Sequence, residues 1–179
     1  MNKVANPVAR LAAPILVLVL AAAVWAGCGD SAKLPAAAPP PSGMPTHAQA
    51  KLHTMKLWLG AEEIIAELAL TPLEQGTGMM FRTNMDENAG MLFPLPVTEQ
   101  ASFWMTNCPL PLSAAYIDPN GVIQEIHELQ ASNNIPVQSA TDNIRFVLEA
   151  PRGWFSRHNI REGTVVRTER GSLMKTFFQ

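Results

Sequence analysis

The sequence predicts a mainly β fold: one compact domain of sandwich or barrel type with two short helices. Short segments in which apolar and polar residues alternate recur between residues 54 and 167, as is typical of half-buried strands. Between two of them, residues 118–121 read Asp-Pro-Asn-Gly, a composition typical of a hairpin turn. The region expected to fold, residues 53–171, is about 120 residues long, enough to bury a core without a metal or a disulfide.

The amino-terminal segment has the pattern of a secretory signal. Lys3 and Arg10 precede an apolar run at residues 11–26, which ends in small residues. A stable membrane span needs about 20 apolar residues, and Pro14 interrupts this shorter run. We therefore expect residues 1–27 to be a signal peptide, with an uncleaved anchor as the alternative.

Residues 24–28, VWAGC, resemble the lipobox of bacterial lipoproteins, in which the cysteine receives a lipid. Trp25 stands where an aliphatic residue is usual. We expect a lipid on Cys28 and a location on the periplasmic or other extracytoplasmic face of a bacterial membrane. The alternative is an ordinary signal peptide followed by an unmodified cysteine. The Pro- and Ala-rich segment 28–52 is expected to be a flexible tether.

Charge and cysteine content exclude some classes of protein. The whole chain has a net charge of -2, and loss of residues 1–27, with two basic residues and no acidic one, gives (13 - 2) - 15 = -4. Nucleic acid is therefore not an expected partner. If Cys28 carries a lipid, Cys108 has no partner for a disulfide within the chain.

The elements of the domain can be assigned in chain order. Thr71, Pro72 and Glu74 form a capping box, which predicts the start of a short helix, and a helix remains the alternative for residues 63–70. Residues 81–90 are expected to be a loop, residues 130–141 irregular and residues 172–179 a tail. Strands are expected at residues 54–59, 63–70, 90–95, 101–106, 112–118, 122–129, 144–148 and 164–167, and helices at residues 72–80 and 154–159.

The central stretch, residues 102–115, places three large apolar side chains in succession. In an extended strand Phe103 and Met105 share one face, so Trp104 points to the other. Trp104 therefore packs beneath a second layer or loop, or it is exposed as a contact residue. Burial is the preferred interpretation, because large aromatic side chains are mostly buried.

Three blocks of the sequence carry a recognisable pattern. They are GMMFRTNMDENAGMLFPL at residues 78–95, SFWMTNCPLPLSAAYIDPNGVIQEI at residues 102–126 and RFVLEAPRGWFSRHNIREGTVV at residues 145–166. Together they resemble one family, the uncharacterised bacterial and archaeal domain of unknown function 192. The blocks occur in the family's order, and the resemblance covers nearly all of residues 53–168. It implies a compact, mainly β fold, often exported, and no established reaction, substrate or cofactor.

The resemblance also marks individual positions. This chain departs from the family pattern at Cys108, where threonine is usual, and at Ser113, where aspartate is usual. If that aspartate has a chemical role in the family, this chain lacks it. The matching residues are Arg82, Gly90, Met91, Phe103, Trp104, Met105, Asn107, Asp118, Gly121 and Glu149.

The residues leave two chemical alternatives open. A hydrolase-like enzyme would use Cys108 or Ser113 with His127 or His158, although no local motif supports a triad. His127 is better explained as a surface or edge residue. A site for cuprous ion is the second alternative, although methionines more often fill irregular gaps in a core. Its sulfur ligands would be Met79, Met80, Met85, Met91 and Met105, gathered near Cys108.

The preferred interpretation is a binding or accessory module of the cell envelope rather than an enzyme. Trp104, Asn107 and Arg82 would surround a groove that recognises a sugar, a peptide carboxylate or an envelope polymer, or would contact a protein partner. Arg82 could equally form an ion pair with Glu149 inside the fold. A third possibility is that the shared residues only maintain the fold. No catalytic residues, metal site or cofactor are expected.

Overall fold

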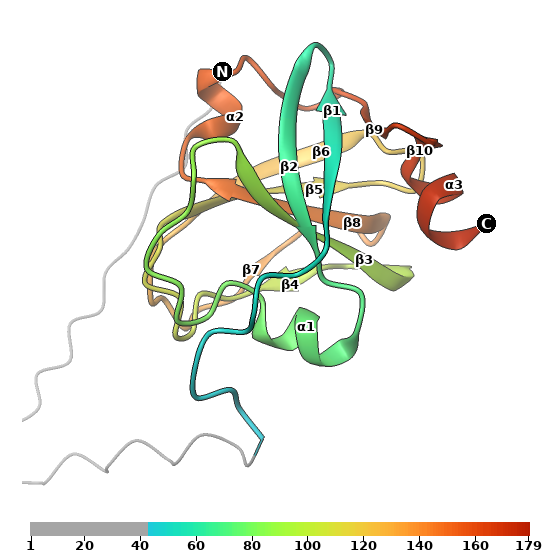
Figure 1. The fold of residues 1–179 in the computed structure, drawn as a ribbon. Coiled ribbons are helices and arrows are strands. Elements are labelled where there is room, and N and C mark those ends of the chain that lie inside the picture. Colours follow the sequence, from blue (N-terminus) through green and yellow to red (C-terminus); the bar gives the residue numbers. More distant parts are fainter. Residues whose placement is uncertain (1–42) are drawn as a thin grey trace, which may run out of the picture. The chain divides into compact units, whose positions relative to one another are not determined.

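The computed structural model describes residues 43–179. The predicted signal peptide, Cys28 and residues 29–42 of the predicted tether lie outside this range. The described part is mainly β, as the sequence predicted, with a curled sheet of eight strands, a small sheet of two strands and three short helices (Figure 1). The elements are β1 (Thr54–Leu59), β2 (Glu62–Leu68), α1 (Pro72–Thr77), β3 (Ala89–Glu99), β4 (Ser102–Phe103), β5 (Leu112–Ile117), β6 (Ile123–Leu129), β7 (Val137–Gln138), β8 (Ile144–Pro151), α2 (Trp154–Arg157), β9 (Val166–Thr168), β10 (Gly171–Ser172) and α3 (Leu173–Phe178).

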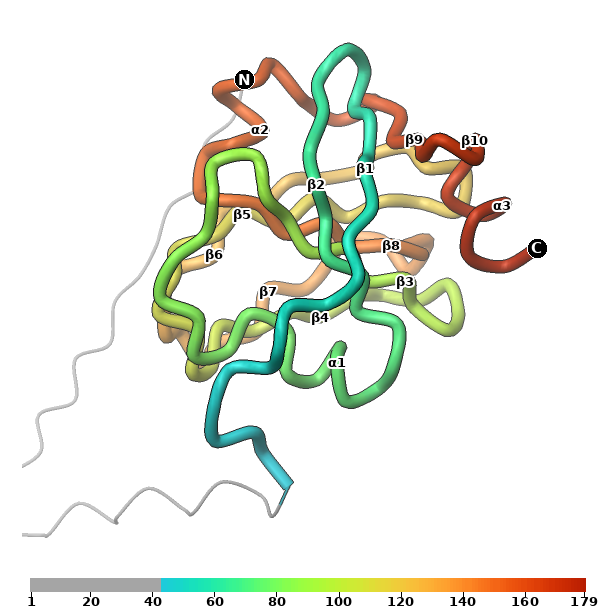
Figure 2. The backbone as a smooth tube through the Cα atoms, in the orientation of Figure 1, coloured from blue at the N-terminus to red at the C-terminus, as the bar shows by residue number. Residues whose placement is uncertain are grey.

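The large sheet curls into a half-barrel. Its strand order is β10-β9-β1-β2-β3-β8-β5-β6, and only β2 and β3 are parallel (Figure 2). The two sides of the curl meet where Val122 forms a bridge with Val165 and the amide of Ile123 donates to the carbonyl of Thr164 over 2.9 Å. Gly121, with φ +81°, permits this approach, because a Cβ atom there would lie 2.9 Å from the carbonyl oxygen of Val166.

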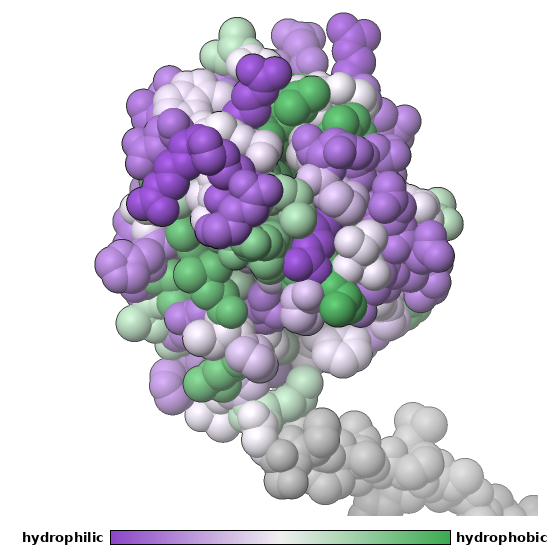
Figure 3. All heavy atoms as spheres, turned by 90° about the vertical axis from the view of Figure 1, so that its right-hand side faces the viewer, coloured by the Kyte–Doolittle hydropathy of each residue, from purple (hydrophilic) through white to green (hydrophobic). Residues whose placement is uncertain are grey.

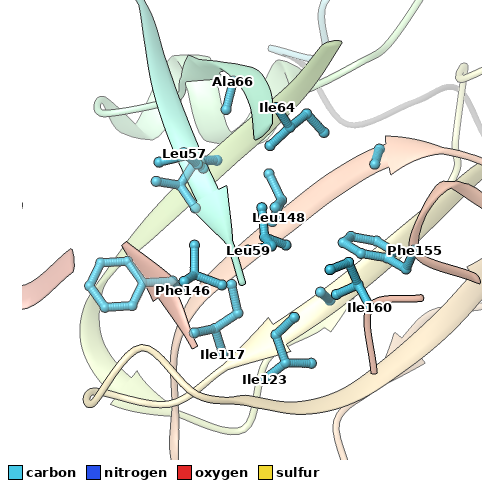
Figure 4. Packing of buried hydrophobic residues seen from close by; sticks show 14 of the residues in the cluster. Leu57, Leu59, Ile64, Ala66, Ile117, Ile123, Phe146, Leu148, Phe155 and Ile160 are labelled. Carbon is cyan, nitrogen blue, oxygen red and sulfur yellow. The ribbon is translucent and has the colours of Figure 1, made fainter. Parts of the chain in front are cut away.

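The central strands β3, β5 and β8 are largely buried on both faces of the sheet. One apolar cluster fills the inside of the curl and includes Leu57, Leu59, Ile117 and Leu148 (Figure 4). Alternate residues of β3, β5 and β8 point the other way into a second apolar cluster, against which the side chains of β4 and β7 pack. Burial on both faces explains why β3 and β8 are apolar over several consecutive residues.

Local sequence signals decide where α1 begins and ends. The Thr71 hydroxyl accepts a hydrogen bond from the amide of Glu74 over 3.2 Å, and the Glu74 carboxylate accepts from the amide of Thr71 over 2.8 Å. The predicted capping box is therefore confirmed. The helix ends at Thr77 rather than near Met80, because Gly78 takes a positive φ of 46°.

The carboxyl-terminal segment differs from the expected tail. Residues 173–178 form α3, a third helix, where the sequence indicated two. Ser172 caps it by accepting a hydrogen bond from the amide of Lys175. Leu173 is fully buried and Phe177 packs against the first apolar cluster, so the helix closes one end of the half-barrel.

The amino-terminal end of the described region contacts the domain. Gln49 donates to the carbonyl of Gly78 over 2.9 Å, and the amide of Leu52 donates to the Glu67 carboxylate over 2.7 Å. Residues 49–52 of the predicted tether are thus held against the folded region.

The surface is mixed in polarity. On the face drawn in Figure 3, small groups of apolar side chains alternate with hydrophilic ones. None of the helices within residues 43–179 combines the length and the apolar character that a membrane span requires. Large exposed apolar side chains include Leu70, Leu73, Val97 and Trp104.

Candidate functional site

Trp104 is exposed, which corrects the prediction that it is buried. Its side chain is 55% exposed, whereas Met105 is 3% exposed and Phe103 packs against the second apolar cluster. The strand is shorter than predicted, because β4 ends at Phe103 and the amide of Met105 bonds to the carbonyl of Asn133. The expected alternation is present, but among residues 43–179 no layer covers the side of the strand to which Trp104 points.

A cavity lies beside Trp104. One wall comes from α1 and the loop that follows it, and the other comes from β4 and the residues after it. Its volume is about 250 Å³. Its walls combine aromatic, thioether, thiol and aliphatic groups with the amide of one glutamine and the hydroxyls of serine and threonine, and its one carboxyl group comes from Glu149. The lining residues most relevant to binding are Met79, Met80, Phe103, Trp104, Met105, Cys108 and Glu149.

Glu149 is a buried carboxyl group without hydrogen-bond partners among residues 43–179. It lies on β8, where its neighbours across the sheet are Met91 on β3 and Ala114 on β5. Glu149 is 4% exposed, and its Oε2 atom is fully enclosed and has no hydrogen-bond partner among the described residues. Burial raises the pKa of Glu149 from 4.5 to about 8, so the carboxyl is largely protonated at neutral pH.

Gly90 permits the close packing of β3 against β8 next to Glu149. A Cβ atom at residue 90 would lie 2.8 Å from the backbone carbonyl oxygen of Glu149 and 3.0 Å from the side chain of Ile64. The backbone contact cannot be relieved by a rotamer change, so this position favours glycine.

Arg82 pairs with Glu67, which corrects the suggested pairing with Glu149. Its two terminal nitrogens donate to the two oxygens of Glu67 over 2.6 and 2.8 Å, in a bidentate arrangement. Both side chains are mostly buried, at 16% and 10% exposure. Arg82 lines a different hollow, with Lys51 and Asp86, and is not among the residues around Trp104.

Asn107 has a role in the backbone rather than in the cavity. It takes a left-handed conformation with φ +56°, which asparagine tolerates better than most residues. Its carbonyl accepts a hydrogen bond from the amide of Phe81 over 2.7 Å, which fixes the loop after α1 against the turn that contains Asn107. Of the four residues singled out from the sequence, the structure therefore brings Trp104 and Glu149 to one cavity and places Arg82 and Asn107 outside it.

The profile of the DUF192 family, described as an uncharacterized ACR, matches residues 56–168. The chain belongs to the DUF192 family. The matched region contains the residues that line the cavity, including Trp104 and Glu149, and the match confirms the family that the sequence resembles.

Two solved structures are similar to this DUF192 domain. One is a protein of Sinorhizobium meliloti 1021 described as a "putative transcription regulator", with a TM-score of 0.64 and 26% identity over 68% of this chain and 98% of that one. The other is a protein of unknown function from Novosphingobium aromaticivorans DSM 12444, with a TM-score of 0.58 and 27% identity over 64% of this chain and 83% of that one. No match is found among curated proteins.

The two positions at which this DUF192 chain departs from the family pattern do not form a triad with either histidine. The Ser113 hydroxyl donates to Glu128 over 2.7 Å and accepts from the amide of Gly153 over 2.8 Å. Burial, together with the nearby Glu149 charge, raises the pKa of Cys108 to about 11, which disfavours the nucleophilic thiolate.

The two histidines have carboxylate partners of their own. His127 Nε2 lies 2.6 Å from Glu125 on β6, at the edge of the sheet, as expected for an edge residue. His158 Nδ1 lies 2.8 Å from Glu62, and its ring stacks on Trp154. The geometry therefore does not support the hydrolase-like alternative.

Sulfur atoms gather at the DUF192 cavity. Met79, Met80, Met105 and Cys108 line it, whereas Met91 belongs to the apolar cluster behind it. Met85 packs against the same cluster. Within the described residues, no group of three or more His, Cys, Asp or Glu side chains is arranged to hold a metal ion. Any metal at this site would therefore depend on thioether ligands.

Sequence reasoning missed the wall that α1 and its following loop contribute, including Gln75 and Thr77. Glu149 was singled out only through the family resemblance, although the pattern of its own strand also indicates it. In the segment FVLEA, residues 147 and 149 fall on one face of the strand, so the glutamate replaces an apolar residue at a position that faces a core.

Proposed function

We propose that this chain is an exported, lipid-tethered binding module that holds a small ligand in the cavity between Trp104 and Glu149. The proposal of export rests on the sequence of residues 1–27 and on Cys28 after small residues, as in bacterial lipoproteins. We do not propose nucleic acid as a partner, because the chain without residues 1–27 carries a net charge of -4.

The unpartnered carboxyl of Glu149 is the observation that carries the binding function. A buried polar group without hydrogen bonds destabilises the folded state by a few kcal/mol. An apolar side chain at residue 149 would avoid that cost among neighbours such as Met91 and Ala114. A ligand that enters beside the exposed Trp104 could supply the missing partners, which supports a role in recognition.

Binding can be tested with four compounds that share a six-carbon chain: n-hexylamine, n-hexanol, hexanamide and hexanoate. Amide chemical-shift changes would be followed by NMR on the purified protein. We expect at least one compound to perturb residues around the cavity, and Trp104→Ala to weaken its binding. Trp58→Ala is the matched control, because Trp58 lies on β1 and does not line the cavity. Absence of binding by all four compounds would contradict the proposed site.

Export and lipidation have a separate test. The mass of the mature amino terminus from a bacterial host should show cleavage before Cys28 and an added diacylglyceryl group. An unmodified Cys28 would contradict the lipid tether without affecting the cavity.

A cuprous-ion carrier is the second candidate, favoured by the four sulfur-containing residues that line the cavity. An anaerobic titration with Cu(I) would then show one equivalent bound, and the pair Met79→Leu with Met105→Leu would abolish it. Met55→Leu is the control, because Met55 packs against the first apolar cluster. Retention of binding by the double variant would contradict a thioether site.

A further inference from the structure

The Glu149 cavity continues into an apolar groove on the surface. The groove is lined by Leu73, Pro72, Met44 and Pro45, and it shares Gly76, Thr77, Met80 and Trp104 with the cavity. Trp104 therefore stands at the boundary between them. Leu73, at 72% exposure, is an unusually exposed leucine, and it provides one wall of the groove. The combined site is elongated, with an apolar outer part and a carboxyl group at its inner part.

The charges around this combined site favour one sign of ligand. Among the described lining residues of the cavity and the groove there is no lysine, arginine or histidine. A ligand anion would therefore meet no cationic side chain there, while Glu149 offers a carboxyl group whose Oε2 atom has no hydrogen-bond partner among residues 43–179. A primary ammonium group carries a positive charge and three hydrogen-bond donors, and both properties suit a carboxylate. The rings of Trp104 and Phe103 in the cavity wall add cation–π attraction.

From this arrangement we infer that the site binds a primary amine attached to an apolar chain, with the ammonium group on the Glu149 carboxylate and the chain over Trp104 and Leu73. This inference rests on the proposed binding function and names its ligand class. The apolar chain would lie where the groove is least polar, and each buried methylene should strengthen binding about fourfold.

Binding of an amine requires Glu149 to give up its proton. With a pKa of about 8, close to nine-tenths of the Glu149 carboxyls are protonated at pH 7, so about 0.9 proton should pass to the buffer for each amine bound. Burial, and after it the nearby Glu149 charge, raises the pKa of both Cys108 and Tyr116. Neither group ionises at pH 7, so the released proton can be assigned to Glu149.

The test is calorimetric titration of the purified protein at pH 7 with n-hexylamine, n-hexanol and hexanoate, in two buffers of different ionisation enthalpy. We expect n-hexylamine to bind at least about tenfold more tightly than the other two, with proton release. Glu149→Gln should abolish this preference and the proton release. Its urea midpoint at pH 7 would verify that the variant is folded.

A second pair of variants tests the groove. Leu73→Ala should weaken the binding of n-hexylamine more than that of n-propylamine, because the longer chain extends further from Glu149 towards the groove. Leu70→Ala is the matched control, since Leu70 is also exposed and lines neither hollow. Equal affinity for the alcohol or the acid, absent proton release, or an unchanged preference in Glu149→Gln would overturn the inference. If hexanol, hexanoate or hexanamide binds while the amine does not, the binding module stands and the ligand class is wrong. If none of the four compounds binds, both the binding module and the ligand class fail.

Discussion

Glu149→Gln is expected to remove a large pH dependence from the folding stability. The folded protein keeps the Glu149 proton up to a pKa of about 8, whereas the unfolded chain loses it near 4.5. The difference of 8 - 4.5 = 3.5 units corresponds to about 5 kcal/mol at 1.36 kcal/mol per unit. Because the unfolded state binds fewer protons in this window, the free energy of unfolding falls as pH rises from about 4.5 to 8 and is constant with respect to this group above it.

Most of the effect is accessible to measurement between pH 5 and pH 8, where linkage gives a change of about 3 to 4 kcal/mol. Urea unfolding would be followed by tryptophan fluorescence, for which the fully buried Trp154 is a suitable reporter. Glutamine keeps the shape of the side chain but does not titrate, so the difference in stability between wild type and variant should change with pH by this amount.

The control is Glu99→Gln, an exposed residue of β3, which should leave the pH dependence of the wild type unchanged. Two outcomes would refute the reasoning about Glu149. In the first, the free energies of unfolding of the wild type and of Glu149→Gln change in parallel from pH 5 to pH 8. In the second, the wild type gains stability relative to the variant as pH rises, which would mean that a partner stabilises the Glu149 carboxylate.

Three further predictions concern other parts of the fold. Arg82→Met should lower the free energy of unfolding, measured in urea, by about 3 kcal/mol, because the buried Glu67 carboxylate loses its guanidinium partner. A decrease below about 1 kcal/mol would contradict a tight buried pair. Thr71→Ala should lower the free energy of unfolding by about 1 kcal/mol through loss of the cap of α1, and an unchanged urea midpoint would argue against it. Cys108 should resist iodoacetamide at pH 8 until the protein is unfolded, since its pKa is raised to about 11; rapid native labelling at Cys108 in peptide mass analysis would contradict the burial.

Features governed by neighbouring residues could be predicted closely from the sequence. The capping box of Thr71 and Glu74 and the turn at Asp118–Gly121 depend on bonds between residues two to four positions apart, such as the 2.9 Å bond from the amide of Val122 to Asp118. Strand periodicity indicated which residues of β1 and β2 face the core. The sequence left a helix open as the alternative for residues 63–70, and the structure excludes it, because residues 62–68 form β2. These features can be predicted because the interactions that set them join residues close together in the sequence.

The candidate site depended on contacts between distant segments. Local pattern showed that Trp104 points away from Phe103 and Met105, but not whether another layer covers it. The partner of Arg82 lies on β2, 15 residues earlier, whereas the sequence analysis had considered only Glu149 as a partner inside the fold.

Sequence alone determined the mainly β class, the family and the side of the strand to which each residue of the central stretch points. The tertiary structure decided that Trp104 is exposed, that Arg82 is paired elsewhere and that Glu149 faces a cavity without a partner. The physical reason is that alternation along a strand fixes only the direction of a side chain. What it meets there depends on how the sheet curls and on which loops, such as the one after α1, pack against it.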